Sequence, residues 1–178
     1  MLDGEKNIIK SAIRGKSSSF GLLYDHYQPR IYRFIYLKVS HREEAEDLTH
    51  QVFLSAWQNI DNYKFKGFPF SSFLYRIARN QVIDYYRTKK KNVSLENIAD
   101  PEIESFSEKI IDSNLELEKV REAITQLNPE QQDVIIMRFV EDLSSQEVAK
   151  ALNKSSGAVR LLQYRAIKNL KRIMNNEA

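Results

Sequence analysis

The 178-residue chain contains no cysteine, which excludes disulfide bonds and thiolate zinc sites. It has five glycines and four prolines, and apolar and polar residues almost never alternate as they do in strands. No apolar run approaches the roughly 18 residues of a membrane helix, and the first residues, MLDGEKNIIK, have no apolar core of a signal peptide. We therefore expect an all-α fold, a cytoplasmic location and no membrane insertion.

Charge is distributed unevenly along the chain. Residues 1–92 carry a formal charge of +7, residues 93–120 carry −6 and residues 121–178 carry +2. Two basic parts around an acidic segment are typical of two DNA-facing modules joined by a connector that avoids DNA. We predict two small helical domains, at 1–92 and 113–178, joined by an acidic flexible linker at 93–112.

The clearest local pattern is a pair of helices near the C-terminus. Ser144 and Glu147 form a capping box, which predicts a helix from Ser145 to about Leu152. Asn153-Lys154-Ser155 interrupts the pattern, and Ser155 can cap a second, longer helix. A short helix, a tight turn and a second helix make up a helix-turn-helix, which inserts its second helix into the major groove of DNA.

The second helix of this pair has two distinct faces. Apolar residues recur at helical spacing and predict the buried face: Val159, Leu162, Ala166, Leu170 and Ile173. The other face carries Arg160, Leu161, Tyr164, Arg165 and Lys168. Residues 153–176 contain six Lys/Arg and no Asp/Glu, which favours DNA binding over a merely solvated face.

Three helices are predicted in the first 60 residues. The first spans Glu5–Ile13, and the second begins near Ser18 and is expected to kink or restart at Pro29. Ser40 and Glu43 read as another capping box, which would open the third helix at Glu43.

The third helix presents an inward apolar stripe and a polar outer face. The outer face carries Glu43, Asp47, His50, Gln51, Leu54 and Gln58. Glu46, Asp47 and His50 lie at spacings that can hold a metal, so a metal enzyme is one alternative. Such a site needs a matching cluster on another helix, and the remaining histidines, His26 and His41, have no such cluster beside them. We expect no metal, no cofactor and no catalytic residue.

A second basic block lies at 62–91, with eight Lys/Arg against one Asp. Its first part is a loop in which Lys64 and Lys66 alternate with Phe65 and Phe68, and a helix follows from about Ser71. Cations beside aromatics suit single-stranded nucleic acid, because bases stack on the rings while the charges follow the phosphates. Burial of the loop aromatics in the core is the equally weighted alternative.

With these motifs in place, the chain resembles a bacterial sigma factor of the extracytoplasmic-function (ECF) class. AEDLTHQVFLSAW is similar to conserved region 2.2, and FSSFLYRIARNQVIDYYR to regions 2.3 and 2.4. LNPEQQDVIIMRF, LSSQEVAKAL and SSGAVRLLQYRAIKNL are similar to region 4. The order and spacing of these motifs cover nearly the whole chain.

The resemblance implies a non-enzymatic subunit that directs promoter-specific transcription initiation, with a role for each surface. Its partners would be core RNA polymerase, through the β′ clamp helices and the β subunit, promoter DNA and an anti-sigma factor. The polymerase-binding residues would be Asp47, His50, Gln51 and Leu54. The −10 element would be recognised and opened by Lys64, Phe65, Lys66, Phe68, Arg76, Arg79, Asn80, Asp84 and Arg87. The −35 element would be bound by Ser156, Gly157, Arg160, Leu161, Tyr164, Arg165 and Lys168.

Three positions depart from the family pattern. The family usually has Gln-Glu where this chain has His50-Gln51, Thr at Ala158 and Ser at Leu161. Leu161 could contact a thymine methyl group, so an unusual −35 preference is expected. The alternative function is a free-standing helix-turn-helix regulator with an N-terminal sensor or dimerisation domain, although such a domain needs no second nucleic-acid surface.

Overall fold

The computed structural model describes residues 2–63, 69–93 and 115–175. Within these ranges the fold is all-α with no strand, as predicted from the sequence. The elements are α1 (Glu5–Ile13), α2 (Ser17–Val39), α3 (Arg42–Gln58), η1 (Ile60–Asn62), α4 (Phe70–Val93), α5 (Leu115–Thr125), α6 (Pro129–Ile135), η2 (Ile136–Val140), α7 (Ser145–Leu152) and α8 (Ser156–Met174). The predicted linker at 93–112 lies almost entirely outside the described residues.

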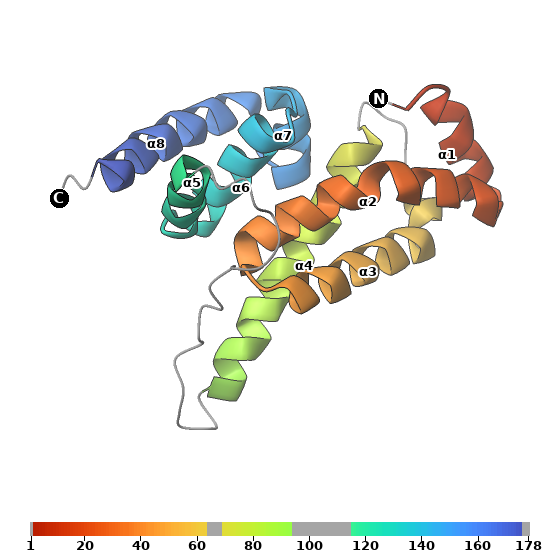
Figure 1. Cartoon of the computed structure of the whole chain (residues 1–178). Helices are drawn as coiled ribbons and strands as arrows, with labels where there is room; N and C mark the ends of the chain where they lie inside the picture. Colours follow the sequence, from red (N-terminus) through yellow and green to blue (C-terminus); the bar gives the residue numbers. More distant parts are fainter. Residues whose placement is uncertain (1, 64–68, 94–114, 176–178) are drawn as a thin grey trace.

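Helices α1 to α4 form the N-terminal unit (Figure 1). Helix α2 contributes a buried stripe to its core, and this stripe meets the buried faces of α3 and α4. The apolar residues of α2 and α3 in this core that are at most 3% exposed are Leu23, Tyr27, Ile31, Phe34 and Ile35 on α2, and Ala45, Val52, Phe53 and Ala56 on α3. The Tyr27 hydroxyl donates a 2.9 Å hydrogen bond to Glu5, which fastens α1 to α2.

The structure corrects two local predictions in this unit, the restart at Pro29 and the cap at Ser40. Helix α2 runs through Pro29 as one element and does not restart there. Helix α3 is capped by His41, whose Nδ1 accepts a 3.4 Å hydrogen bond from the Glu44 backbone N–H, rather than by Ser40. Ser40 has a φ of 55° and closes α2 by donating its N–H to the carbonyl of Tyr36. Because Ser40 adopts the left-handed conformation that ends α2, His41 rather than Ser40 caps α3.

Helices α5 to α8 form the C-terminal unit, and its predicted caps are confirmed. Asn128 accepts a hydrogen bond from the Gln131 N–H and precedes Pro129 at the first helical position of α6. Ser144 and Glu147 make the reciprocal capping box of α7. Ser155 accepts a 3.1 Å hydrogen bond from the Ala158 N–H and begins α8. These side chains pair with N–H groups in the first turns of α6, α7 and α8 and so fix where each helix begins.

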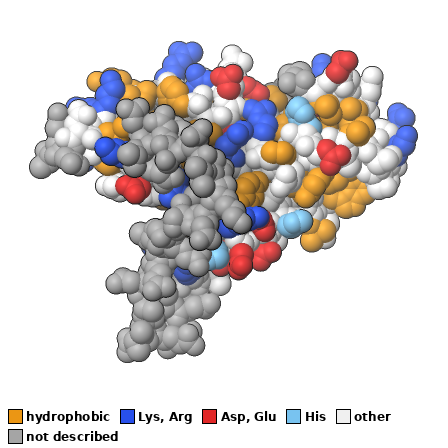
Figure 2. All heavy atoms as spheres, viewed as in Figure 1, with side chains coloured by type: hydrophobic (Ala, Val, Ile, Leu, Met, Phe, Trp, Pro, Cys, Tyr) orange, Lys and Arg blue, Asp and Glu red, His pale blue; other side chains and the backbone are white. Residues whose placement is uncertain are grey.

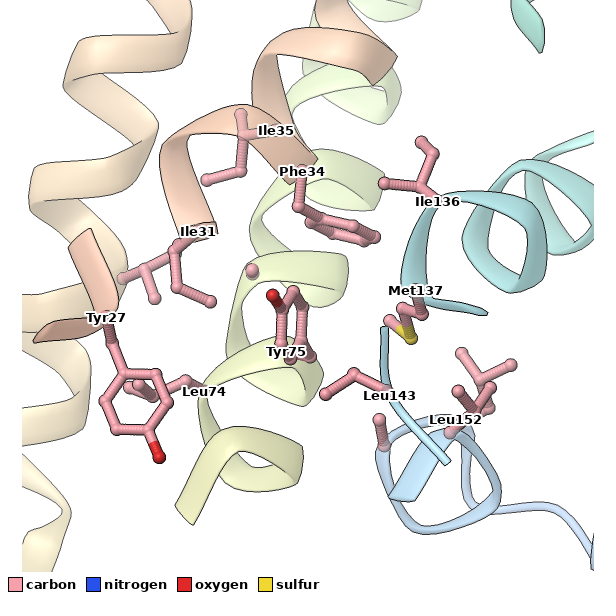
Figure 3. Packing of buried hydrophobic residues seen from close by; sticks show 14 of the residues in the cluster. Tyr27, Ile31, Phe34, Ile35, Leu74, Tyr75, Ile136, Met137, Leu143 and Leu152 are labelled. Carbon is pink, nitrogen blue, oxygen red and sulfur yellow. The ribbon is translucent and has the colours of Figure 1, made fainter. Parts of the chain in front are cut away.

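The two units pack against each other through α4, α2, α7 and η2 (Figure 1). Phe34 and Tyr75 come from the N-terminal unit, with ring centroids 5.3 Å apart, and both are fully buried. Figure 3 shows these rings facing Ile136, Met137 and Leu143 of the C-terminal unit. The cores of the two units are therefore joined into one hydrophobic cluster.

Candidate functional site

The outer face of α3 is exposed as predicted. Asp47, His50, Gln51 and Leu54 are all exposed, while Ala45, Leu48, Val52 and Ala56 point into the core. Leu54 is an apolar residue on this otherwise polar face, and 58% of its surface is exposed to solvent. The predicted periodicity of α3 is therefore confirmed, and the face is available to another molecule.

Leu54 and His50 border an open groove of about 370 Å³ between α2 and α3. Its other lining residues are mostly aromatic: Ser17, Phe20, Tyr24, Phe53 and Trp57. The rings of Phe20 and Trp57 lie 4.8 Å apart and those of Tyr24 and Phe53 4.7 Å apart, so the aromatic side chains that line the groove also pack against one another. Hydrophobic side chains gather over these two helices in the space-filling view (Figure 2). An apolar groove beside an exposed leucine can accept an apolar anchor from a partner.

Glu46 does not join a metal-binding cluster in this structure. Its carboxylate accepts a 2.9 Å hydrogen bond from Arg42, one turn earlier on α3. Among the residues that the structure describes, no three His, Cys, Asp or Glu side chains are grouped so as to hold a metal ion. The geometry gives the metal-enzyme alternative no support.

The residues of α4 that were predicted to open DNA fall into two groups, one exposed to solvent and one in contact with the C-terminal unit. Asn80, Asp84 and Arg87 are exposed, and Arg87 pairs with Asp84 at 2.9 Å. Arg76 and Arg79 instead contact the C-terminal unit: Arg76 donates to the Lys150 carbonyl at 2.8 Å, and Arg79 Nε donates to Asp133 at 2.8 Å. The remaining predicted members, Lys64, Phe65, Lys66 and Phe68, lie outside the described residues.

Sequence reasoning missed a second buried face of α4. Ser71, Ser72 and Tyr75 are at most 4% exposed, and the Ser72 hydroxyl donates a 3.0 Å hydrogen bond to the Glu147 carbonyl of α7. Burial raises the pKa of the Tyr75 hydroxyl above its usual range, and the carboxylate of Glu141 raises it further. Two adjacent small hydroxyl residues in a first helical turn are the sole sequence signal for this contact.

Tyr63, at the start of the basic loop, belongs to the core. It is 7% exposed, and its ring centroid lies 5.4 Å from that of Phe70 and 5.5 Å from that of Phe73. Burial raises its pKa to about 12. For this aromatic residue the core interpretation is confirmed.

Helix α8 presents the predicted acid-free face. Arg160, Leu161, Tyr164, Arg165 and Lys168 are all exposed, and Leu161 and Tyr164 keep 51% and 67% of their surface. Val159 and Ala166 on the opposite side are fully buried. The helix therefore combines a firmly packed inner face with a row of cationic, aromatic and aliphatic side chains that can meet the edges of base pairs.

The N-terminus of α8 is open. Ser156 is half-buried and Gly157 is exposed. A Cβ at Gly157 would meet only Ser155 Oγ, at 4.0 Å, so the packing of the chain itself does not require glycine there. Uncovered backbone N–H groups at a helix N-terminus favour a phosphate group.

Both units of the chain match known protein families. Residues 23–92 match the family model Sigma-70 region 2, and residues 117–170 match Sigma-70, region 4. Within the described residues, no helix has both the length and the apolar character needed to cross a bilayer.

Two curated relatives align with most of the chain. The ECF RNA polymerase sigma factor BldN of Streptomyces coelicolor is 34% identical over 96% of this chain, which spans 66% of the length of BldN. The ECF RNA polymerase sigma factor SigW of Bacillus subtilis is 30% identical over 94% of this chain and 95% of its own length.

Solved structures share the fold. CnrH in complex with the cytosolic domain of CnrY superposes with a TM-score of 0.75 at 21% identity, covering 98% of this chain and 99% of CnrH. The sigma factor RpoE in complex with the anti-sigma factor NepR, from Bartonella quintana, gives 0.72 at 20% identity over 89% and 98% of the two chains.

Proposed function

Because the chain belongs to the ECF class of RNA polymerase sigma factors, non-catalytic subunits whose regions 2 and 4 bind RNA polymerase and recognise promoter elements, we propose how its surfaces divide that task. Residues 1–92 act as the region 2 unit, 93–112 as an acidic linker and 113–178 as the region 4 unit. Residues 23–92, which the alternative of a free-standing regulator assigns to a sensor or dimerisation domain, match Sigma-70 region 2 instead.

The polymerase contact is assigned to the outer face of α3. Asp47, His50, Gln51 and Leu54 meet the β′ clamp helices, with Leu54 and the aromatic groove as the apolar centre and the polar residues as its rim. The C-terminal unit contacts the β subunit. An anti-sigma factor would compete for these surfaces, and the protein acts in the cytoplasm.

The −10 element is assigned to α4 and the loop before it. Arg76, Asn80, Asp84 and Arg87 lie along one side of α4 at intervals of three or four residues, and Arg79 borders this row beside Asn80. This row can follow a DNA strand, and Lys64, Phe65, Lys66 and Phe68 can hold unpaired bases by stacking and charge. Extruding a base costs a few kcal/mol, which stacking on these rings offsets.

The −35 element is assigned to the open face of α8, which is the observation that carries the proposal. Arg160 and Arg165 can donate bidentate hydrogen bonds to guanine edges or phosphates, and Leu161 can contact a thymine methyl group. Lys168 adds a point charge for phosphate. Ser156 and Gly157 open the helix N-terminus to a backbone phosphate.

Transcription in vitro with core polymerase on a genomic promoter library tests this proposal. We expect defined promoters to be selected only when the protein and core enzyme are both present. Tight sequence-specific binding by the isolated full-length protein, unchanged when core is added, would contradict it.

A further inference from the structure

The contact between the two units is rimmed by buried ion pairs. Asp133, at the interface end of α6, accepts hydrogen bonds from Lys38 of α2 and, at 2.8 Å, from Arg79 of α4. The side chains of Lys38 and Asp133 are 2% and 1% exposed. Burial lowers the pKa of Lys38, and the Asp133 carboxylate opposes that shift.

Glu141 holds the second group of ion pairs. Its fully buried carboxylate accepts hydrogen bonds from Arg33 at 2.7 and 3.2 Å and from Arg30 Nε at 3.2 Å. Arg30 also donates to the Glu141 backbone carbonyl. A π-helical turn delivers Glu141 to this position, because its N–H bonds to the carbonyl of Ile136 five residues earlier.

Four cations of the N-terminal unit thus face two carboxylates of the C-terminal unit. The forked approach of Arg33 to Glu141 is also the geometry in which arginine binds phosphate. Without these carboxylates, Arg30, Arg33, Lys38 and Arg79 would form a concentrated positive patch. Arg79 lies on α4 directly before the exposed Asn80 and borders the row that Asn80 and Arg87 share, so the patch adjoins the proposed −10 surface.

We propose that Asp133 and Glu141 act as intramolecular stand-ins for phosphate, and that Arg30, Arg33 and Lys38 bind the DNA backbone together with Arg79 once the two units separate. The patch on α2 is an additional DNA-binding site, and the packed arrangement of the units masks it. The inference rests on the proposed function, because Arg79 joins the patch to the −10 surface. The occupant is nucleic acid rather than an acidic protein because the patch adjoins that row of α4 through Arg79.

The first measurement asks whether the carboxylates hold the units together. Asp133→Asn/Glu141→Gln removes both charges, and Glu122→Gln/Asp142→Asn removes two exposed charges from the same unit as the control. The chain has no cysteine, so cysteines introduced at the exposed Gln58 and Gln146 accept two spin labels without competition. We expect a longer distance between the labels in the first variant only, with helical content unchanged by circular dichroism. Unchanged label distances in the first variant would overturn the masking.

The second measurement asks what the uncovered patch binds. A fluorescein-labelled mixed-sequence DNA duplex is titrated with each isolated full-length variant at several salt concentrations. We expect Asp133→Asn/Glu141→Gln to bind at least about tenfold more tightly than the control variant, because the binding-competent fraction rises. Adding Arg30→Gln/Arg33→Gln should abolish the gain and reduce the salt slope by about 1.8, since each phosphate contact contributes about 0.9.

Besides unchanged label distances, two results of the DNA titration would overturn the inference. A gain in DNA affinity that survives Arg30→Gln/Arg33→Gln would place the DNA elsewhere. Separation of the spin labels without a gain in DNA affinity would mean that the patch serves another anion, such as an acidic protein surface. The proposed function is tested separately by transcription with wild-type protein and core polymerase. Loss of transcription there would contradict the proposed function, whereas either result above would contradict only the inference.

Discussion

The sharpest test of the polymerase-binding face is Leu54→Arg. Leu54 keeps 58% of its surface exposed beside the aromatic groove, so docking would bury that remaining part. Complete burial of a leucine contributes about 1.5–3 kcal/mol, which makes the part still available worth about 1–2 kcal/mol. An arginine there adds the cost of removing a charge from water. We expect a total loss of at least about 2 kcal/mol, or about thirtyfold in Kd for core polymerase.

The same substitution should leave the fold almost unchanged. Substitutions at exposed positions usually change the free energy of unfolding by less than about 0.5 kcal/mol. Leu22→Arg is the matched control, because Leu22 is 52% exposed on α2 and does not line the groove. Binding is measured by competition with labelled wild-type protein for core polymerase, and stability by thermal unfolding. If Leu54→Arg competes as well as Leu22→Arg, the assignment of this face is refuted.

The remaining predictions concern DNA recognition and the fold. Arg160→Ala should reduce the free energy of binding to the −35 element by about 1–3 kcal/mol and relax the sequence preference there. Lys168→Ala should instead weaken binding to all promoters alike and lower the salt dependence of DNA binding by about one charge. Equal effects of Lys168→Ala and Arg160→Ala on base preference, measured by mobility shift with altered −35 sequences, would contradict this division. Asn80→Ala should leave closed complexes intact and reduce permanganate reactivity of −10 thymines; normal reactivity would remove Asn80 from strand opening. Ser144→Ala should destabilise the C-terminal unit by about 0.5–2 kcal/mol through loss of the capping box, and an unchanged melting curve would contradict that.

The sequence correctly predicted those features of the fold that depend only on residues near one another in the chain. The capping box of Ser144 and Glu147 involves groups three residues apart, and the structure reproduces it with both hydrogen bonds. The two-faced pattern of α8 is also local, because helical geometry alone decides which residues share a face. The exposure of Arg160 and the burial of Val159 follow from it directly.

Predictions failed where two local solutions compete or where a distant segment intervenes. Ser40 is a better N-cap residue than His41, yet the end of α2 requires a left-handed residue at position 40, and that requirement prevails. Tyr75 is fully buried because α7 and η2 cover it from more than 60 positions away along the chain. A single-helix pattern contains no information about such a partner, so the engagement of Arg76 and Arg79 could not be predicted.

The composition of the contact between the units explains why DNA alone should not open the chain. Its rim consists of ion pairs, and DNA phosphates can replace the carboxylates there because they satisfy the same arginine and lysine donors. Its centre is apolar, with Phe34 and Tyr75 against Met137 and Leu143, and phosphates offer nothing that compensates for exposing it (Figure 3). A protein surface can cover apolar side chains, and the docking of each unit on polymerase can offset the loss of the central contact. In the wild-type protein we therefore expect separation of the units to require polymerase for the centre and DNA for the rim, in the order polymerase first and promoter second. In Asp133→Asn/Glu141→Gln the cations of the rim are left buried without carboxylates, and their repulsion opposes the packed state even in the absence of polymerase.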